Sequence, residues 1–593
     1  MIGLGVLIVI FVVPVFGIGP ALLPAKFGSP LQRVTVGVAA SLTAIFLLGF
    51  AIYVWNLPVT AHWLLLVTPV AVAWHGRQRL AELWGAPEVR QGALAWLAVT
   101  LWLLGWQFTV FSYSGATWQG DWYEHYDRAR FFLERWDIHH RFLGAYSLSA
   151  RPPLANVVTA EFMSLAGVKF HLFQATCVLL ASLVVWPVCL LQRRFARPEA
   201  TARTGWTILL LMALPALVQN AAFTWTKLPT VFFILTGLVL LSEKAPAFPL
   251  RLAGWLCLTA GMLAHYSAGP WIVALAIAGF VRNPGGWREY FNGQGLAIGL
   301  ACCLLFATWF GWSTQQLGSG ETLGSNSTVV TGSGLSGQQW LGNAAENLYF
   351  TAVPVLFRQV DYGGYTPGDR LVLLRDHYFN AVQSSALMIA GSLGVVVAAC
   401  LLWLERKQID WAVFRYWGCL IGIGLVLGTV VHTEVVTLGV AQICLLPFAF
   451  LVVAWLVARL PGHPLLRGIH ALGLLADFAL GIVLHFAVQS LWLPRWRQPG
   501  QSDYRLIYDF GHAARNNFDY RERISEPFLY DLPGALPATG LLLLAAAVLL
   551  VTSFRLPAAL GSRVAGSARP APQVSAQSAR SERSSEDPLG TQA

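Results

Sequence analysis

The chain alternates between long apolar segments and short polar loops. Several apolar runs approach the roughly 20 residues that a helix needs to cross a hydrocarbon core. They are too long and continuous for barrel strands, and a membrane-spanning backbone must satisfy its hydrogen bonds internally. The pattern therefore predicts an all-α polytopic membrane protein.

About fifteen transmembrane helices are predicted by this pattern. Three lie within residues 1–91, and a fourth ends near Phe111. The later expected spans cover residues 172–191, 205–222, 228–242, 252–264, 267–281, 294–312, 386–404, 412–431, 435–458, 468–493 and 536–554. After Arg151-Pro-Pro, a further helix is expected to lie at the membrane surface or to dip into it.

Three polar stretches separate groups of helices: a loop within residues 112–170, a Gly/Ser-rich loop at 313–384 and a charged segment at 494–534. The tail at 555–593 is rich in Ser, Ala, Pro and Arg, a composition typical of disorder. If the N-terminus lies outside, every short basic loop falls on the cytoplasmic side, as the positive-inside rule requires. The three polar stretches then lie outside, and the C-terminus is cytoplasmic.

Composition narrows the class of protein further. Hydrophobic residues make up 56% of the 593-residue chain, more than in ordinary soluble domains. The net charge of +10 comes from bases spread over short loops, which indicates membrane topology rather than nucleic-acid binding. All eight cysteines lie inside apolar runs, which favours small hydrophobic packing residues over a disulfide framework or a metal cluster.

The first polar loop holds the densest group of ionisable residues. Its sequence is Gly120-Asp-Trp-Tyr-Glu-His-Tyr-Asp-Arg-Ala-Arg130, in a chain where only 11% of residues are charged. At helical spacing, Asp121, Glu124 and His125 share one face, and Asp127 follows. This face suits general-base chemistry, with Asp121 as the first choice, Glu124 as the second, and His125 or Asp127 as an orienting group. The alternative is a solvated helix face balanced by its own arginines.

Two cations are candidates for binding an anionic group. Lys227 stands alone in an apolar stretch at the predicted outer end of two helices, where it is either functional or snorkels to water. Arg151 has the planar geometry for gripping phosphate, or it pairs with a carboxylate of its own loop.

Two further polar groups interrupt apolar runs at predicted outer helix ends. They are His265-Tyr266 and His432-Thr-Glu434. Either group could line a catalytic cavity, or it could simply cap a helix at the interface. No His and acid spacing typical of a metal site is present in the sequence.

The loop resembles a known family. An acidic first external loop, an amphipathic aromatic stretch and a basic residue before Pro-Pro-Leu154 are similar to the polytopic GT-C glycosyltransferases, and among them to the family 39-like protein mannosyltransferases and aminoarabinose transferases. This chain has Asp121-Trp122 where that group usually has Asp-Glu, and Arg151 where it has Lys. The departure leaves open whether Asp121 or Glu124 is the base.

The resemblance implies a membrane glycosyltransferase that moves a sugar from a polyprenyl-phosphate donor to a lipid, glycan or protein acceptor of the envelope. It implies that the enzyme acts on the outer face of a bacterial inner membrane. It also implies no cofactor, although other GT-C branches use a divalent cation, which Asp121 would bind in this chain. The expected domains are helices at 1–91, a catalytic module at 92–320, a loop at 321–384, helices at 385–554 and the tail at 555–593.

Two rival functions remain open from the sequence. An O-antigen ligase or polymerase would use a large late external loop, and the loop at 313–384 contains Arg358, Arg370, Arg375 and His377. A transporter or flippase of lipid-linked sugars would be expected to show inverted repeats and broken helices, and the sequence shows no clear internal repeat.

Overall fold

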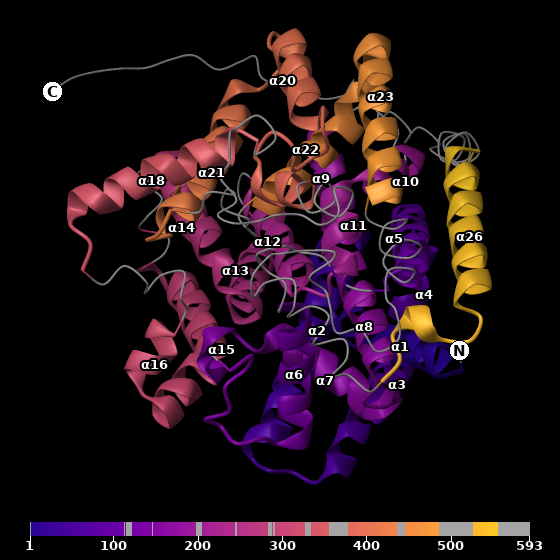
Figure 1. Cartoon of the computed structure of the whole chain (residues 1–593), viewed down its shortest axis with the longest axis vertical. Coiled ribbons are helices and arrows are strands. Elements are labelled where there is room, and N and C mark those ends of the chain that lie inside the picture. Colours follow the sequence, from indigo (N-terminus) through magenta and orange to yellow (C-terminus); the bar gives the residue numbers. More distant parts are fainter. Residues whose placement is uncertain are drawn as a thin grey trace, which may run out of the picture.

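The computed structural model describes residues 2–111, 113, 121–144, 146–196, 204–243, 246–282, 288, 291–325, 334–354, 378–435, 445–484 and 526–555. Within these residues every regular element is a helix, and the only strand-like pairing is an isolated bridge between Phe142 and Tyr146. The predicted all-α class is therefore confirmed. Helices from distant parts of the sequence lie side by side in one bundle (Figure 1).

The first helices form one side of the bundle. They are α1 (Ile2–Leu22), α2 (Pro30–Val54), α3 (Leu64–His75), α4 (Arg77–Gly85) and α5 (Pro87–Gln107). Ser29 and Gln32 form a capping box at the start of α2, directly before a proline at its first position. Gly19 of α1 meets Gly37 of α2 so closely that a Cβ at either position would overlap the opposite backbone.

The core is built from short, apolar central helices. They are α7 (Leu154–Ala166), α8 (Phe170–Ser182), α9 (Val185–Phe195), α10 (Thr204–Ala213), α11 (Pro215–Ala222), α12 (Lys227–Leu241) and α13 (Phe248–Ala264). Every residue of α12 from Lys227 to Leu240 is buried, as are all residues of α7 from Leu154 to Met163. The helix expected after Arg151-Pro-Pro is therefore present, but it lies inside the protein, between α1, α2, α6 and α8, rather than on a membrane surface.

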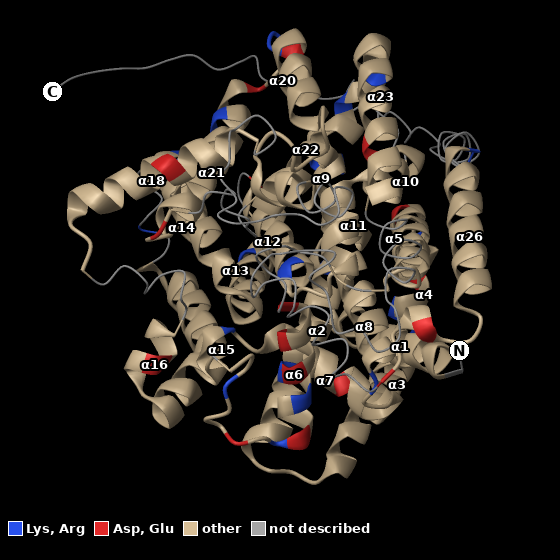
Figure 2. Cartoon of the chain, in the orientation of Figure 1, with Lys and Arg blue, Asp and Glu red and all other residues tan. Residues whose placement is uncertain are grey.

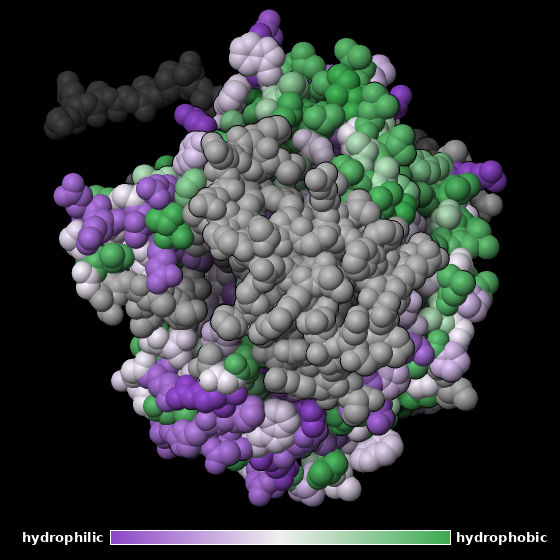
Figure 3. All heavy atoms as spheres, viewed as in Figure 1, coloured by the Kyte–Doolittle hydropathy of each residue, from purple (hydrophilic) through white to green (hydrophobic). Residues whose placement is uncertain are grey.

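The remaining helices surround this core. They are α14 (Gly269–Arg282), α15 (Gly293–Leu317), α16 (Ser319–Gly324), α18 (Gly337–Ala352), α20 (Gly394–Glu405), α21 (Trp411–Val430), α22 (Leu445–Arg459), α23 (Pro464–Leu480) and α26 (Ala535–Arg555). On α23 and α26, large apolar side chains such as Leu472 and Leu541 are exposed, as expected for helices that face lipid. Figure 3 shows hydrophobic residues over these helices and hydrophilic ones at the opposite end.

Eight described helices are long and apolar enough to cross a membrane, and ten spans result if each of two bent helix pairs counts as one. Shorter apolar helices occupy the predicted spans at 228–242, 252–264, 267–281 and 386–404. The chain is thus a multi-spanning helical protein, while the number of fifteen spans is not confirmed. The seven described cysteines are all free.

Candidate active site around helix α6

The charged motif folds as helix α6 (Asp121–Glu134), which packs against α7. Glu124, His125, Asp127 and Arg128 are buried, although a charged run of this kind is usually solvated. The alternative of a solvated helix face is therefore wrong for these four residues, because other protein groups cover them. Figure 2 shows acidic and basic residues gathered along α6, away from the largely uncharged helices above it.

Arg128 is the anchor of this buried network. Its Nε donates to Glu124 Oε1 at 2.7 Å, one helical turn earlier. Its two terminal nitrogens donate to the carbonyls of Leu148 and Ser147 at 2.8 and 2.9 Å. Arg128 thus ties α6 to the segment just before Arg151, and a guanidinium with three acceptors can remain charged inside the protein.

Arg151 lies between the two candidate bases. Its Nη2 is 3.7 Å from Asp121 Oδ1, and its Nε is 3.7 Å from Glu124 Oε1. The side chains of Arg151 and Asp121 are 18% and 19% exposed, whereas that of Glu124 is 0% exposed. The structure therefore shows the predicted pairing with loop carboxylates, but at distances longer than direct hydrogen bonds, and the Arg151–Asp121 pair is the accessible part of the cluster.

Lys227 reaches the same cluster from the first residue of α12. Its Nζ lies 3.4 Å from the centre of the Trp225 ring, and Trp225 Nε1 donates to Asp121 Oδ2 at 3.1 Å. Lys227 is buried, so it does not snorkel to water. Thr224, with a φ of 57°, turns the chain just before this pair.

The two carboxyl groups have opposite electrostatic surroundings. Burial raises the pKa of Asp121 above its ordinary value, and neighbouring Arg151 only partly opposes this. Burial acts in the same direction on Glu124, but Arg128 and Arg151 together hold the pKa of Glu124 below its usual range. Two carboxyl groups with pKa values pushed apart can take different roles, a permanent anion and a proton acceptor.

His125 and His265 lie at the edges of the cluster. His125 Nδ1 donates to Asn156 Oδ1 at 3.2 Å, and burial lowers the pKa of His125 to about 3, so this imidazole is neutral. His265 caps the short helix η5 (Tyr266–Ala268), and Tyr266 donates to the carbonyl of Ser149 at 2.8 Å. These three residues therefore line or support the cluster from α6, α13 and η5.

Asp127 lies on another flank of α6. The nearest described base is Arg130, whose Nη1 is 4.0 Å from Asp127 Oδ1. Burial raises the pKa of Asp127 to about 7, with Arg130 opposing the shift. Asp127 is thus a buried carboxyl group that is protonated in mildly acidic solution, nearly two turns along α6 from Asp121.

The pKa of Asp127 predicts a pH dependence of stability. A carboxyl group whose pKa is higher in the folded state stabilises that state when protonated, and this contribution is lost as pH rises from about 4 to about 7. Asp127→Asn mimics the protonated form and should remove this loss. Thermal unfolding midpoints at pH 5 and pH 8 should differ less in Asp127→Asn than in the wild type. The control Asp137→Asn, at an exposed position beyond α6, should keep the wild-type difference.

His432 and Glu434 lie beyond the end of α21. There, Asn343 and Asn347 of α18 donate to the carbonyls of Thr433 and Glu434 at 2.8 and 2.9 Å. No contact described in the structure joins them to the cluster around Asp121. Arg358, Arg370, Arg375 and His377, on which the ligase alternative depends, lie outside the described residues.

From the sequence, Arg128 is expected only to balance charge, and no pattern singles out Trp225. The spacing of four residues between Glu124 and Arg128 is typical of an ion pair along a helix and could have indicated their contact. For Trp225, only its closeness in sequence to Lys227 pointed to the site. In the described part of the chain, no three His, Cys, Asp or Glu side chains are placed to share a metal ion.

The segment just before α26 contacts both α6 and α8. Glu526 accepts hydrogen bonds from the Tyr126 hydroxyl and from the Phe170 N–H, the latter at 3.0 Å. Phe528 packs on Phe170 with ring centres 4.4 Å apart. Residues 526–531 therefore lie on the same side of the molecule as α6.

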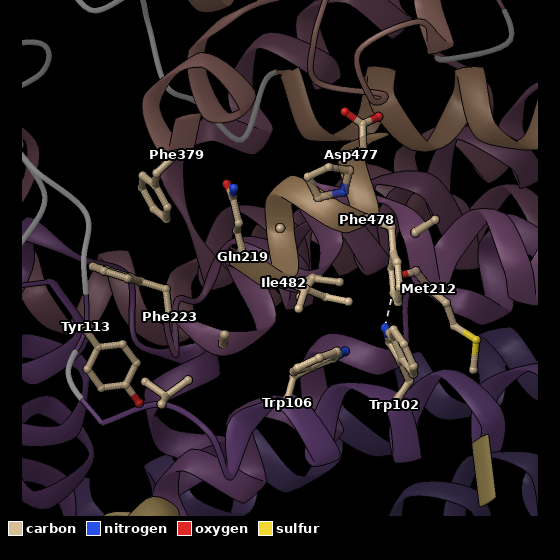
Figure 4. A pocket seen from close by; sticks show the side chains of 16 residues that line it. Trp102, Trp106, Tyr113, Met212, Gln219, Phe223, Phe379, Asp477, Phe478 and Ile482 are labelled. Atoms are coloured by element: carbon tan, nitrogen blue, oxygen red, sulfur yellow. Dashed lines mark hydrogen bonds between the residues drawn. The ribbon is translucent and has the colours of Figure 1, made fainter. Parts of the chain in front are cut away.

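A small apolar cavity of about 40 Å³ lies between α5, α11 and α23. Figure 4 shows Trp102 and Trp106 along one wall, with Tyr113 and Phe223 at one end. Tyr113 stacks on Trp122 with ring centres 4.6 Å apart, and Phe223 contacts Trp225 at 4.2 Å. One layer of aromatic rings therefore separates this cavity from the residues around Asp121.

No family model matches the chain, and no curated protein matches it at a significant level. Among solved structures, it is similar to ArnT from Cupriavidus metallidurans bound to undecaprenyl phosphate, with 14% identity, a TM-score of 0.44, and 81% of this chain and 80% of that chain covered. The apo form of ArnT gives 12% identity, a TM-score of 0.40, and coverage of 78% and 75%. Both TM-scores lie below 0.5.

Proposed function

We propose that the chain is an integral membrane glycosyltransferase that moves a sugar from a polyprenyl-phosphate donor to an envelope acceptor on the outer face of the membrane. The observation that carries this proposal is the meeting of an accessible carboxyl group, Asp121, with two cations, Arg151 and Lys227, that come from different elements. Such transfer needs a proton acceptor for the nucleophile and positive charge for the departing phosphate.

The opposite surroundings of the carboxyl groups favour Asp121 as the base. Glu124 is fully buried and committed to Arg128, so it serves as a fixed anion that holds Arg128 and Arg151 in place. Asp121 is partly exposed, and its raised pKa makes its carboxylate a stronger proton acceptor than an ordinary aspartate. This division of roles supports Asp121 over Glu124 as the base.

In the proposed reaction, Asp121 accepts the proton of an acceptor hydroxyl or amine while that group attacks the anomeric carbon of the donor sugar. The bond between that carbon and the phosphate oxygen breaks, and the polyprenyl phosphate leaves with the bonding electrons. Arg151 and Lys227 stabilise the negative charge that develops on this leaving group. The Arg151–Asp121 separation of 3.7 Å leaves the guanidinium nitrogens available for phosphate oxygens.

The experiment that tests the function compares envelope lipids and glycans from cells with and without the gene by mass spectrometry. Accumulation of one polyprenyl-phosphate sugar and loss of one sugar from an acceptor would identify both substrates. If all lipid-linked sugars and envelope glycans stay unchanged, the proposed transfer does not occur. A lipid-linked sugar that accumulates only on the cytoplasmic face would favour a flippase instead.

Binding of undecaprenyl phosphate should depend on the two cations. Arg151→Gln and Lys227→Met should each weaken binding roughly 10- to 100-fold, the loss expected for one charge-assisted hydrogen bond. Arg151→Lys should recover only part of the affinity, because a lysine cannot bind two phosphate oxygens with a planar fork. Native mass spectrometry of the purified protein measures this binding.

The control for this measurement is Arg130→Gln, which removes an arginine on α6 whose Nε bonds Glu134 at 2.8 Å. It should bind undecaprenyl phosphate like the wild type. Equal losses in all three charge-removing variants would indicate a general effect of net charge and would contradict specific roles for Arg151 and Lys227.

The proposed orientation places α6 outside the cytoplasm. Asp137→Cys, in the exposed turn after α6, should therefore react with a membrane-impermeant maleimide in intact cells, because no membrane separates it from the reagent. The wild-type protein, whose seven described cysteines are free, provides the background. Labelling that appears only after the cells are opened would place α6 in the cytoplasm and overturn the proposed site of transfer.

A further inference from the structure

A second, larger cavity lies in another part of the molecule, between α20, α21 and α22 and the end of α9. Its volume is about 610 Å³, within the range of about 300 to 1,000 Å³ typical of ligand sites. Helix α20 packs on α22, whereas α21 packs on α14 and α18, and α20 and α21 run in different directions (Figure 1). The cavity is a groove lined by residues of these helices. The groove walls are apolar and include Ala398, Leu402, Ile421, Leu425 and Leu451.

This groove opens at the end of the bundle opposite α6. The span that contains α8 and α9 runs for 26 residues, from Phe170 to Phe195, which corresponds to a length of about 39 Å. Phe170 contacts Tyr126 of α6, with ring centres 5.1 Å apart, and Phe195 lines the groove. The groove mouth is thus separated from α6 by the thickness of a membrane core.

Two arginines gather at this mouth around one carbonyl oxygen. Arg194, which lines the groove, donates through Nη2 to the carbonyl of Ser242 at 3.5 Å, and Arg282 donates through Nη1 to the same oxygen at 3.4 Å. Within the described residues, neither arginine forms an ion pair. Two like charges held this close repel each other, and a shared anion would relieve the repulsion.

The acids near the mouth already have partners. Glu405 is buried and pairs with Arg459 at 3.2 Å and with His463 at 3.0 Å. Asp410 caps α21 by accepting from the backbone N–H groups of Ala412 and Val413 at 3.0 and 3.3 Å. Asp410 itself lines the groove. Neither acid contacts Arg194 or Arg282 among the described contacts, so neither arginine is paired with a carboxylate within the described residues.

An aromatic collar lies between these charges and the apolar walls. Phe195 contacts Trp417 and Trp455, with ring centres 5.5 and 5.8 Å apart, and the Arg282 guanidinium lies 5.0 Å from the Tyr416 ring. Tryptophan and tyrosine prefer the boundary between lipid chains and head groups. The order of basic mouth, aromatic collar and apolar groove matches the order of head group, interface and acyl chain in a lipid.

We propose that this groove binds an anionic glycerophospholipid of the leaflet opposite the α6 cluster. Its phosphate lies between Arg194 and Arg282, and one acyl chain lies between α20 and α21. In the predicted orientation this is the cytoplasmic leaflet, where basic pockets between transmembrane helices commonly hold anionic head groups. The site is separate from the Asp121 cluster and does not depend on the proposed transfer reaction.

The test is native mass spectrometry of the purified full-length protein, titrated with phosphatidylglycerol or with phosphatidylcholine of the same acyl chains. The wild type should prefer phosphatidylglycerol, and Arg194→Gln/Arg282→Gln should reduce this preference roughly ten- to thirtyfold, the factor expected for two basic groups beside an anionic lipid. The control Arg77→Gln/Arg79→Gln removes two other arginines that donate to backbone carbonyls and should keep the preference.

A second variant tests the groove without changing charge. Gly422 lines the groove, and a Cβ added there would meet open space, so Gly422→Phe should place its ring in the groove. It should weaken binding of both lipids at least tenfold while keeping their order of preference. Equal binding of the two lipids by the wild type, or unchanged binding in both the arginine double variant and Gly422→Phe, would overturn the proposal.

Discussion

Asp121→Asn should lower the rate of sugar transfer by roughly 10²- to 10⁴-fold, the usual contribution of a general base. Asparagine has almost the same shape as aspartate and can still accept the hydrogen bond from Trp225, so the cluster should keep its geometry. An amide cannot accept the proton of the nucleophile at neutral pH, however. The loss should therefore appear in the rate of the chemical step rather than in the amount of folded protein.

Binding of undecaprenyl phosphate separates this effect from a structural one. Asp121→Asn removes a negative charge beside Arg151 and Lys227, so phosphate binding should be equal or tighter than in the wild type. In the wild type, activity should fall as pH drops through the raised pKa of Asp121, because only the ionised form accepts a proton. Asp137→Asn serves as the matched control and should keep full activity. Full activity in Asp121→Asn would remove Asp121 as the base.

Glu124→Gln should produce the largest loss of stability. It leaves the buried Arg128 guanidinium without its anion, and breaking one side of a buried ion pair commonly costs about 3–5 kcal/mol. Arg151 also loses one of its two carboxylate neighbours, so the loop from Ser147 to Arg151 should loosen. The measurement is the thermal unfolding of detergent-purified protein, followed by tryptophan fluorescence.

Glu134→Gln is the matched control, since it removes a carboxylate from the same helix in an exposed pair with Arg130. Exposed pairs contribute about 0–1 kcal/mol, so this variant should unfold close to the wild type. The double variant Glu124→Gln/Arg128→Met removes both charges and should recover part of the lost stability. An unfolding temperature in Glu124→Gln equal to that in Glu134→Gln would contradict the anchoring role of the Glu124–Arg128 pair.

The helical class followed from the apolar runs, because a continuous run of that length has few alternatives in a membrane. The number of spans did not follow, and α12 shows the reason. It is apolar and buried on all sides, so its sequence looks the same whether its neighbours are helices or lipid. Hydropathy alone therefore could not separate short core helices from complete spans.

For the candidate site, the spacing of Asp121, Glu124 and His125 correctly predicted a helix, and the structure brings Arg151 and Lys227 to it. Their meeting could not be worked out from local pattern, because it depends on how α6, α7 and α12 pack. The burial of Glu124 and Arg128 could not be predicted either, because a charged run is expected to be solvated unless its partners are known. The roles of these residues in transfer stay predictions until the variants are measured.

Glu526 joins the segment before α26 to α6 and α8 through hydrogen bonds. Because one carboxylate accepts from both the Tyr126 hydroxyl and the Phe170 N–H, it acts as a latch between α6 and α8. Any outward swing of α6 to admit a bulky substrate must either carry the last helix with it or release this latch. A chain cut before Glu526 should thus have a looser α6 even though every residue of the Asp121 cluster is still present.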